Sequence, residues 1–154
     1  MKRAQDLVKE KGADLIAISV DAVIRDALKL MVAKHIGAIL VFDGDEDNIV
    51  GIWTERDFLR NSIVDEFDPS HSRIGDYMTK DLITVESSEN IYRMMDKFLG
   101  LRVRHLPVKK DGKIIALLSA GDVIKAALQD KTKEFNDLNE MVSWEYYENW
   151  RWSK

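Results

Sequence analysis

The chain has 154 residues, 45% hydrophobic and 32% charged, which is enough for a packed core in one compact unit or two small ones. The net charge of −4 argues against general nucleic-acid binding, and no apolar run approaches the roughly 18 residues of a membrane span. Cysteine is absent, which excludes disulfides, thiol catalysis and thiolate zinc sites. We therefore expect a cytoplasmic protein without a signal peptide that binds neither nucleic acid nor membranes.

The first half of the chain is predicted to form a β-α-β-β-α unit, preceded by a helix that closes at Gly12. A β-rich run at Leu15–Ile18 leads into a helix whose apolar residues recur at helical spacing. Two strands joined by a polar turn follow, and a second helix begins just after Thr54. The apolar helix positions are Val23, Ala27, Leu30 and Met31, and the two strands are Ala38–Phe42 and Ile49–Trp53.

The second half shows the same order of elements after a polar linker and a short helical turn at Ile74–Thr79. The β-rich run is Leu82–Val85, and the final helix begins just after Ser119. The apolar helix positions are Ile91, Met94, Met95 and Phe98, and the two strands are Arg104–Val108 and Ile114–Leu118.

The two halves are copies of one another. Asp14–Ser19 returns 67 residues later as Asp81–Glu86, and after a shorter second hairpin an offset of 65 pairs Asp57 with Asp122. The sequence thus predicts an α+β fold of two tandem repeats, packed sheet to sheet with pseudo-twofold symmetry because each half-sized unit leaves one sheet face uncovered. The predicted boundaries are 1–64 for the first copy with its N-terminal helix, 65–73 for the linker, 74–130 for the second copy and 131–154 for a helical tail.

The tail belongs to neither copy and is rich in aromatic residues. Three of the four tryptophans and two of the four tyrosines fall within Trp144–Trp152. One interpretation is a helix packed on its own body or on a second copy of the chain in a homodimer. The other is a docking segment for another protein, because Trp and Tyr are favoured interface anchors.

The most specific motif is a strand-to-helix junction that occurs once in each copy. GIWTERD at Gly51–Asp57 is echoed by ALLSAGD at Ala116–Asp122: a strand ends, a hydroxyl residue starts a helix, and a carboxylate follows three positions later. Helix capping by Thr54 and Ser119 explains this pattern. Ligand binding explains it too, because such a carboxylate can accept hydrogen bonds from a ribose diol, while the hydroxyl and the helix N–H groups hold a ribose or phosphate oxygen. Neighbouring strand residues, among them Ile18, Ala38 and Ile39, could line an apolar slot for a flat base.

With these motifs the chain resembles a known family. The runs VDAVIRDALKLMVAKHIGAILVF and VRHLPVKKDGKIIALLSAGDVIKAAL, and the G-h-x-[T/S]-x-x-D element in each copy, are similar to the paired CBS domain, called a Bateman module and named after cystathionine β-synthase. The likeness covers Ala4 to Leu128 and is closest to stand-alone bacterial pairs, whose second copy carries a similar VRHLPV.

The resemblance implies a regulatory module that is not an enzyme and requires no cofactor or metal. It implies binding of AMP, ADP, ATP, NAD or S-adenosylmethionine in the cleft between the copies, with signalling to an unidentified partner protein, and usually a homodimer. By position, the carboxylates bind ribose, Arg104 and His105 face phosphate, and the strand backbone reads adenine. The implied ligand-binding residues are Thr54, Asp57, Ser119, Asp122, Ile18, Ala38, Ile39, Thr84, Arg104, His105, Leu106 and Pro107.

The sequence departs from the family pattern at three places. Ala116 stands where the motif expects Gly, Ala17 stands where the second copy has Thr84, and the first copy has Gly37-Ala38 where the second has Arg104-His105. We therefore expect two unequal sites.

Two other functions compete with this interpretation. An enzyme would need catalytic motifs, but the three histidines are scattered and the chain has no nucleophile elbow, Walker loop or HExxH element. A scaffold that binds no ligand and acts through its aromatic tail is the main alternative. A ligand-binding measurement distinguishes the two, because the regulatory module binds an adenosyl compound and the scaffold binds none.

Overall fold

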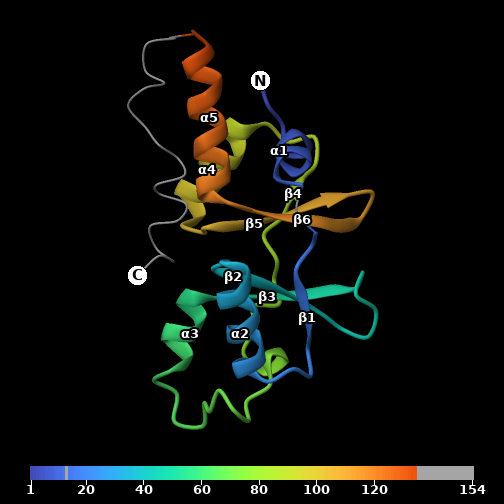
Figure 1. Ribbon diagram of the computed structural model, residues 1–154, viewed down its shortest axis with the longest axis vertical. Coiled ribbons are helices and arrows are strands. Elements are labelled where there is room, and N and C mark those ends of the chain that lie inside the picture. Colours follow the sequence, from blue (N-terminus) through green and yellow to red (C-terminus); the bar gives the residue numbers. More distant parts are fainter. Residues whose placement is uncertain (13, 135–154) are drawn as a thin grey trace. The chain divides into compact units, whose positions relative to one another are not determined.

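The computed structural model describes residues 1–12 and 14–134 and has a mixed α+β fold (Figure 1). Two three-stranded sheets follow the same order, β1-β2-β3 and β4-β5-β6, so the predicted α+β fold with its repeated β-α-β-β-α pattern is confirmed. Of the predicted tail at 131–154, residues 131–134 belong to α5 and the remainder lies outside the described residues. The elements are α1 (Ala4–Lys11), β1 (Ala17–Ser19), α2 (Ile24–Lys34), β2 (Ala38–Phe42), β3 (Ile49–Thr54), α3 (Glu55–Asn61), the 3-10 helix η1 (Ile74–Asp76), β4 (Val85–Glu86), α4 (Ile91–Leu101), β5 (His105–Lys110), β6 (Lys113–Ser119) and α5 (Ala120–Glu134).

The first sheet has one parallel and one antiparallel pair of strands. β1 runs parallel to β2, with Ala17 opposite Leu40, and β2 runs antiparallel to β3, with Ala38 opposite Thr54. β1 begins two residues later than predicted, because only Ala17–Ser19 find partners on β2. The sheet therefore places the end of β3 beside the start of β2.

The hairpin of the second sheet is tighter than that of the first. Asp111 and Gly112 connect β5 and β6 with φ values of 50° and 79°. Positive φ at both central residues is typical of the two-residue turn that matches the twist of antiparallel strands. Both strands therefore extend farther toward the turn than their alternating pattern predicted.

An aromatic chain fastens α3 and the linker to β3. Trp53 is fully buried, and its indole Nε1 donates to Asn61 Oδ1 at 2.9 Å. Phe58 meets the Trp53 ring edge-on with centroids 5.9 Å apart, and Phe67 and Tyr77 continue the chain of ring contacts. These contacts hold the helix that follows β3 in one orientation.

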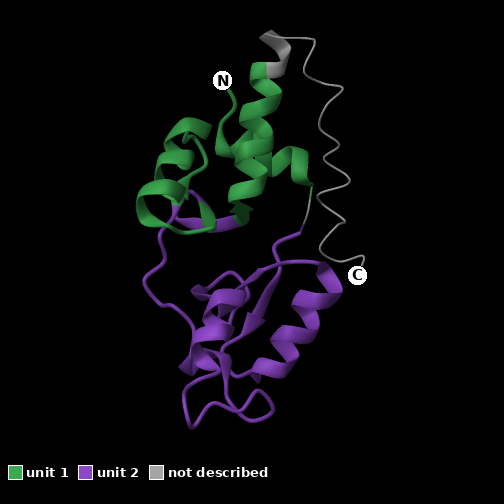
Figure 2. Cartoon of the chain, turned by 90° about the vertical axis from the view of Figure 1, so that its left-hand side faces the viewer, with its two compact units in different colours: residues 1–13, 85–108, 116–154 green, residues 14–84, 109–115 purple. Residues whose placement is uncertain are grey.

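The chain divides into two compact units that are not continuous in sequence (Figure 2). Of the described residues, 14–84 and 109–115 form one unit, and 1–12, 85–108 and 116–134 form the other. The N-terminal helix, which the sequence grouped with the first copy, is thus grouped with the second copy in space. The boundaries of the repeats along the chain stay predictions.

Backbone hydrogen bonds explain this exchange of segments. The amide of Ala4 donates to Glu89 O at 2.8 Å, and that of Ile91 donates to Lys2 O at 3.2 Å. In the other unit, the amide of Ile24 donates to Ser72 O at 2.9 Å. The N-terminal segment therefore packs before α4 as the linker packs before α2.

None of the helices in the described part of the chain combines the length and the apolar character that crossing a membrane requires.

Candidate functional site

The first junction, where β3 meets α3, is closed by a reciprocal capping box. Thr54 is the N-cap, and its Oγ1 accepts a hydrogen bond from the Asp57 amide at 3.2 Å. In return, Asp57 Oδ2 accepts from the Thr54 amide at 2.9 Å and from the Thr54 hydroxyl at 3.0 Å. The predicted capping interaction is therefore present, and it holds the half-buried carboxylate at the start of the helix.

The second junction, where β6 meets α5, repeats these bonds. Asp122 Oδ2 accepts from the Ser119 amide at 2.8 Å, and the Asp122 amide donates to Ser119 Oγ at 3.1 Å. Here a lysine joins the junction: Lys11 Nζ lies 2.9 Å from Asp122 Oδ2 and donates to Leu117 O at 3.2 Å. The sequence analysis did not select Lys11, because no local pattern links it to a residue more than a hundred positions away.

In both junctions a backbone bond ties the helix start to the residue before the neighbouring strand. The Glu55 amide donates to Gly37 O at 3.0 Å, and the Ala120 amide donates to Arg104 O at 2.8 Å. Arg104 therefore takes in the second copy the position that Gly37 takes in the first. The side chain of Arg104 is exposed, whereas the first copy has a glycine at this position.

The capping bonds leave room for the ligand-binding interpretation. Both caps use Oδ2 of their aspartate, and none of the capping bonds uses Oδ1. A carboxylate can accept about four hydrogen bonds, so capping and ribose binding are compatible at the same residue.

The strand residues predicted to bind a base lie mostly inside the two units. Ile39 and Leu106 are fully buried and Ala38 nearly so. The other predicted positions are Ile18, half-buried on β1, Thr84, half-buried before β4, His105, half-buried at the start of β5, and Pro107, buried in β5.

The structure explains why the motif begins with glycine in the first junction and with alanine in the second. A Cβ on Gly51 would overlap the Met78 side chain and lie 3.1 Å from Thr79 O. The backbone of Thr79 pairs there with Ile52, through bonds of 3.0 and 2.8 Å. Ala116, the matching residue of the second copy, is 8% exposed and carries its methyl group.

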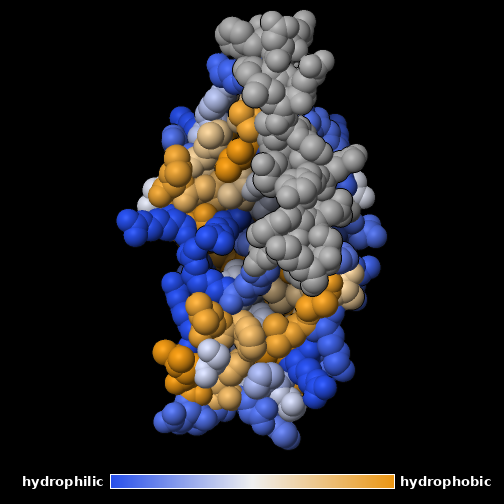
Figure 3. All heavy atoms as spheres, turned by 60° about the vertical axis from the view of Figure 1, so that its left-hand side comes forward, coloured by the Kyte–Doolittle hydropathy of each residue, from blue (hydrophilic) through white to orange (hydrophobic). Residues whose placement is uncertain are grey.

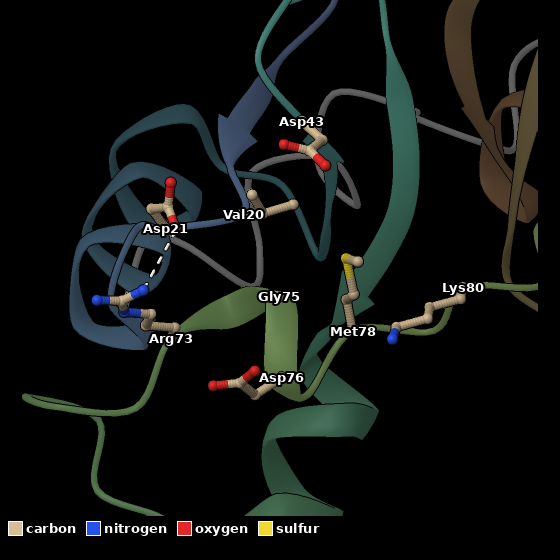
Figure 4. Close-up of a pocket in the computed structure, with 8 residues that line it drawn as sticks. All are labelled: Val20, Asp21, Asp43, Arg73, Gly75, Asp76, Met78 and Lys80. Atoms are coloured by element: carbon tan, nitrogen blue, oxygen red, sulfur yellow. Dashed lines mark hydrogen bonds and ion pairs between the residues drawn. The ribbon is translucent and has the colours of Figure 1, made fainter.

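A separate surface pocket of about 370 Å³ contains none of the predicted ligand residues (Figure 4). Arg73 and Asp21 lie side by side at its edge, with Arg73 Nη1 3.4 Å from Asp21 Oδ1. Carboxylates and cations are mixed around it, so the pocket does not favour a ligand of one charge. The lining residues are Val20, Asp21, Asp43, Arg73, Gly75, Asp76, Met78 and Lys80. Among the described residues no cluster of three or more His, Asp or Glu side chains could hold a metal ion.

Residues 6–63 and 74–129 each match the CBS domain family. The CBS domain-containing protein CBSX3, mitochondrial, of Arabidopsis thaliana is 34% identical over 148 residues, which cover 92% of this chain and 72% of that protein. The chain belongs to the CBS-domain family and carries two CBS domains.

Solved structures of CBS-domain proteins agree with this assignment. The CBS domain protein NE2398 is 38% identical with a TM-score of 0.77, covering 83% of this chain and 99% of its own. A protein with CBS domains from Burkholderia ambifaria is 35% identical with a TM-score of 0.77, covering 84% and 96%. CBSX2, solved in complex with AMP, is 28% identical with a TM-score of 0.70, covering 85% and 99%. The resemblance to stand-alone CBS pairs, bacterial ones included, is thus confirmed.

Proposed function

We propose that this protein is a regulatory module that binds an adenine nucleotide at its two strand-to-helix junctions and signals its occupancy to a partner protein. The observation that carries the proposal is the duplicated capped carboxylate, Asp57 and Asp122, held with the same geometry in both copies. CBSX2, with two thirds or more of each chain aligned, was solved with AMP, which supports the same ligand class here.

Ribose recognition is the chemistry that these carboxylates suit. A diol offers two donors on adjacent carbons, and an ionised carboxylate is a strong acceptor that uses only one oxygen for its cap. Thr54 and Ser119 place a hydroxyl beside each carboxylate. We assign Asp57 and Asp122 as the ribose-binding groups, with the hydroxyls beside them.

The other parts of the nucleotide are assigned to the strands. The backbone near Ala38 and Leu106 offers the amide and carbonyl groups that read an adenine edge, and Ile18 contributes apolar surface. Arg104, exposed just before β5, supplies positive charge for phosphate together with His105. AMP is the first candidate, followed by ADP, ATP, NAD and S-adenosylmethionine, with no separate cofactor and no reaction of the bound ligand.

Assembly and location are further parts of the proposal. Apolar side chains lie exposed on three helices: Leu59 on α3, Leu99 on α4 and Ile124 on α5, and orange apolar groups are visible on the surface in Figure 3. We propose that a homodimer covers such surface, with the aromatic tail contributing, and that the protein acts in the cytoplasm.

A thermal-shift screen followed by calorimetric titration tests the ligand. At 100 times its dissociation constant, a ligand that binds only the folded state adds about 2.7 kcal/mol of stability. AMP should therefore raise the melting temperature by several degrees, while guanosine monophosphate serves as the control. Flat melting curves with every adenosyl compound at millimolar concentration would instead favour the scaffold that acts through its tail.

Light scattering tests the assembly. Deleting residues 133–154 should weaken the dimer and leave AMP binding largely intact. A full-length protein that stays monomeric at tens of micromolar would contradict the homodimer.

A further inference from the structure

Lys11 occupies the carboxylate that the proposed function assigns to the second site. Its ammonium group lies 2.9 Å from Asp122 Oδ2 and also donates to Leu117 O, so two acceptors of the second junction hold it. The side chains of Lys11 and Asp122 are 39% and 32% exposed, so a small molecule from solvent can reach this ion pair.

At the first junction, the carboxylate of Asp57 contacts a neutral hydroxyl group instead of an ammonium group. There the Thr54 hydroxyl donates to Asp57 Oδ2 at 3.0 Å, whereas the Lys11 ammonium group contacts the corresponding oxygen of Asp122. A hydroxyl can rotate toward another acceptor when a ligand arrives. A lysine must give up a charge-assisted hydrogen bond, which is stronger than a neutral one.

Helix α1 carries Lys11 and is tied to α5 at both of its ends. Near its start, the Lys2 amide donates to Asp130 Oδ2 at 3.3 Å, and Lys2 Nζ donates to Gln129 Oε1 at 3.3 Å. Near its end, Lys11 reaches Asp122 in the first turn of the same helix. Leu7 is buried between these two ties. Of these two contacts between α1 and α5, only the one at the C-terminal end of α1 uses a proposed ligand-binding group, the Asp122 carboxylate.

From this geometry we infer that Lys11 competes at Asp122 Oδ2 with a ligand ribose whose diol uses both carboxylate oxygens, which makes the second site the weaker one and couples its occupancy to helix α1. The inference rests on the proposed function, because it concerns the regulation of the same site. A nucleotide whose ribose engages Asp122 displaces the ammonium group and releases the C-terminal end of α1 from α5. Because the ammonium group and the ribose exclude each other at Asp122, weakening the Lys11 contact strengthens ligand binding, and ligand binding weakens the contact.

The test isolates the second site and removes the competitor. In an Asp57→Ala background, calorimetry compares Lys11→Met with the unchanged lysine for two probes, AMP and adenosine. Because partly exposed ion pairs contribute modestly, Lys11→Met should tighten both probes about twofold to fivefold. Lys11→Arg keeps the ion pair and should leave both affinities unchanged. Lys9→Met removes a charge from the same helix and is the matched control, which should also leave both affinities unchanged.

Amide exchange of α1 provides a second readout that affinity alone does not give. Saturating AMP should speed hydrogen exchange at the Gly12 amide, which bonds to Val8 O at 3.2 Å. In Lys11→Met this exchange should already be fast and should not respond to AMP. Circular dichroism of each variant without ligand checks that the fold is kept, and Lys11→Gln is the second variant if methionine is poorly tolerated.

The outcomes separate the inference from the function on which it rests. If wild-type protein binds no adenosyl compound, the proposed function fails. If it binds AMP but Lys11→Met and Lys11→Gln leave the affinity of the second site unchanged, the inference alone is overturned. If Lys11→Met weakens AMP and leaves adenosine unchanged, Lys11 contacts phosphate instead of competing for Asp122, which also overturns the inference.

Discussion

The two junctions of this protein share their hydrogen bonds but differ in the segment that packs beside them. At the first, the backbone of Thr79 pairs with Ile52. At the second, the matching carbonyl, that of Leu117, accepts a hydrogen bond from the Lys11 side chain. The two copies thus share the local capping geometry. The segment that contacts each junction at Ile52 or Leu117, however, comes from a different part of the chain.

The different neighbouring segments change both the packing and the charge at the two junctions. A backbone neighbour approaches closely and requires glycine at position 51. A side-chain neighbour leaves room for the Ala116 methyl group and brings a positive charge to Asp122. One structural exchange thus accounts for a departure from the family motif and supports the proposal that the two sites are unequal.

The largest expected effect comes from the matching core residues Trp53 and Leu118. Both are fully buried one position before a junction hydroxyl. Trp53→Ala should cost about 3–5 kcal/mol of unfolding free energy, and Leu118→Ala about 2–5 kcal/mol, because each leaves a cavity. Urea denaturation measures both. A cost below about 1 kcal/mol for Trp53→Ala would contradict the role of the aromatic chain in holding α3.

Removing one carboxylate at a time compares the two sites directly. Asp57→Ala and Asp122→Ala should each weaken nucleotide binding by about 1.5–3 kcal/mol at one site, because each loses a charged acceptor. Each should also lower folding stability by about 1 kcal/mol through the lost capping bond. Titration calorimetry and denaturation separate the two effects. Unchanged affinity in both variants would leave these residues with helix capping alone.

Substituting alanine for Gly51 and glycine for Ala116 tests whether the segments that pack beside the two junctions determine these residues. Gly51→Ala should destabilise the protein by about 1–3 kcal/mol, because the new methyl group forces Met78 to move and crowds Thr79 O. Ala116→Gly should cost about 0.5–1 kcal/mol, the usual penalty for glycine inside a strand. If both exchanges cost the same in thermal denaturation, the close approach at Gly51 does not explain the motif.

The smallest expected effect concerns the linker, which packs with the first copy. The hydrogen bond from His71 Nδ1 at 2.7 Å, together with one from the Ser70 amide, lowers the pKa of Asp68 below its usual 3.8. A lowered pKa gives stability that is present above the unfolded-state value and is lost as the pH falls through the folded-state value. Asp68→Asn should therefore be slightly less stable than wild type at about pH 6. The difference should shrink as the pH falls below 3.8 and vanish once the pH is below the folded-state pKa of Asp68. A gap that persists there would rule out this hydrogen bond as its source.

The sequence by itself determined the duplication, the order of the elements and the two capped junctions. These features depend on residues close together along the chain: an offset repeated at every element, apolar residues at helical or strand spacing, and a hydroxyl three positions before a carboxylate. A capping bond between Thr54 and Asp57 needs no information from the rest of the fold. The strand ends, in contrast, differ from the predicted ends by one or two residues. The pairing partner on the neighbouring strand sets where a strand ends, and local sequence does not contain that information.

Only the tertiary structure decided which segment packs against each junction. Lys11 meets Asp122 across 111 positions of sequence, and α1 joins the unit of the second copy although it precedes the first. No periodicity or spacing encodes such a contact, because it depends on the path of the chain through the whole fold. The capping chemistry of both junctions was therefore readable from the residues, whereas the ion pair between Lys11 and Asp122 became visible only once distant segments were brought together.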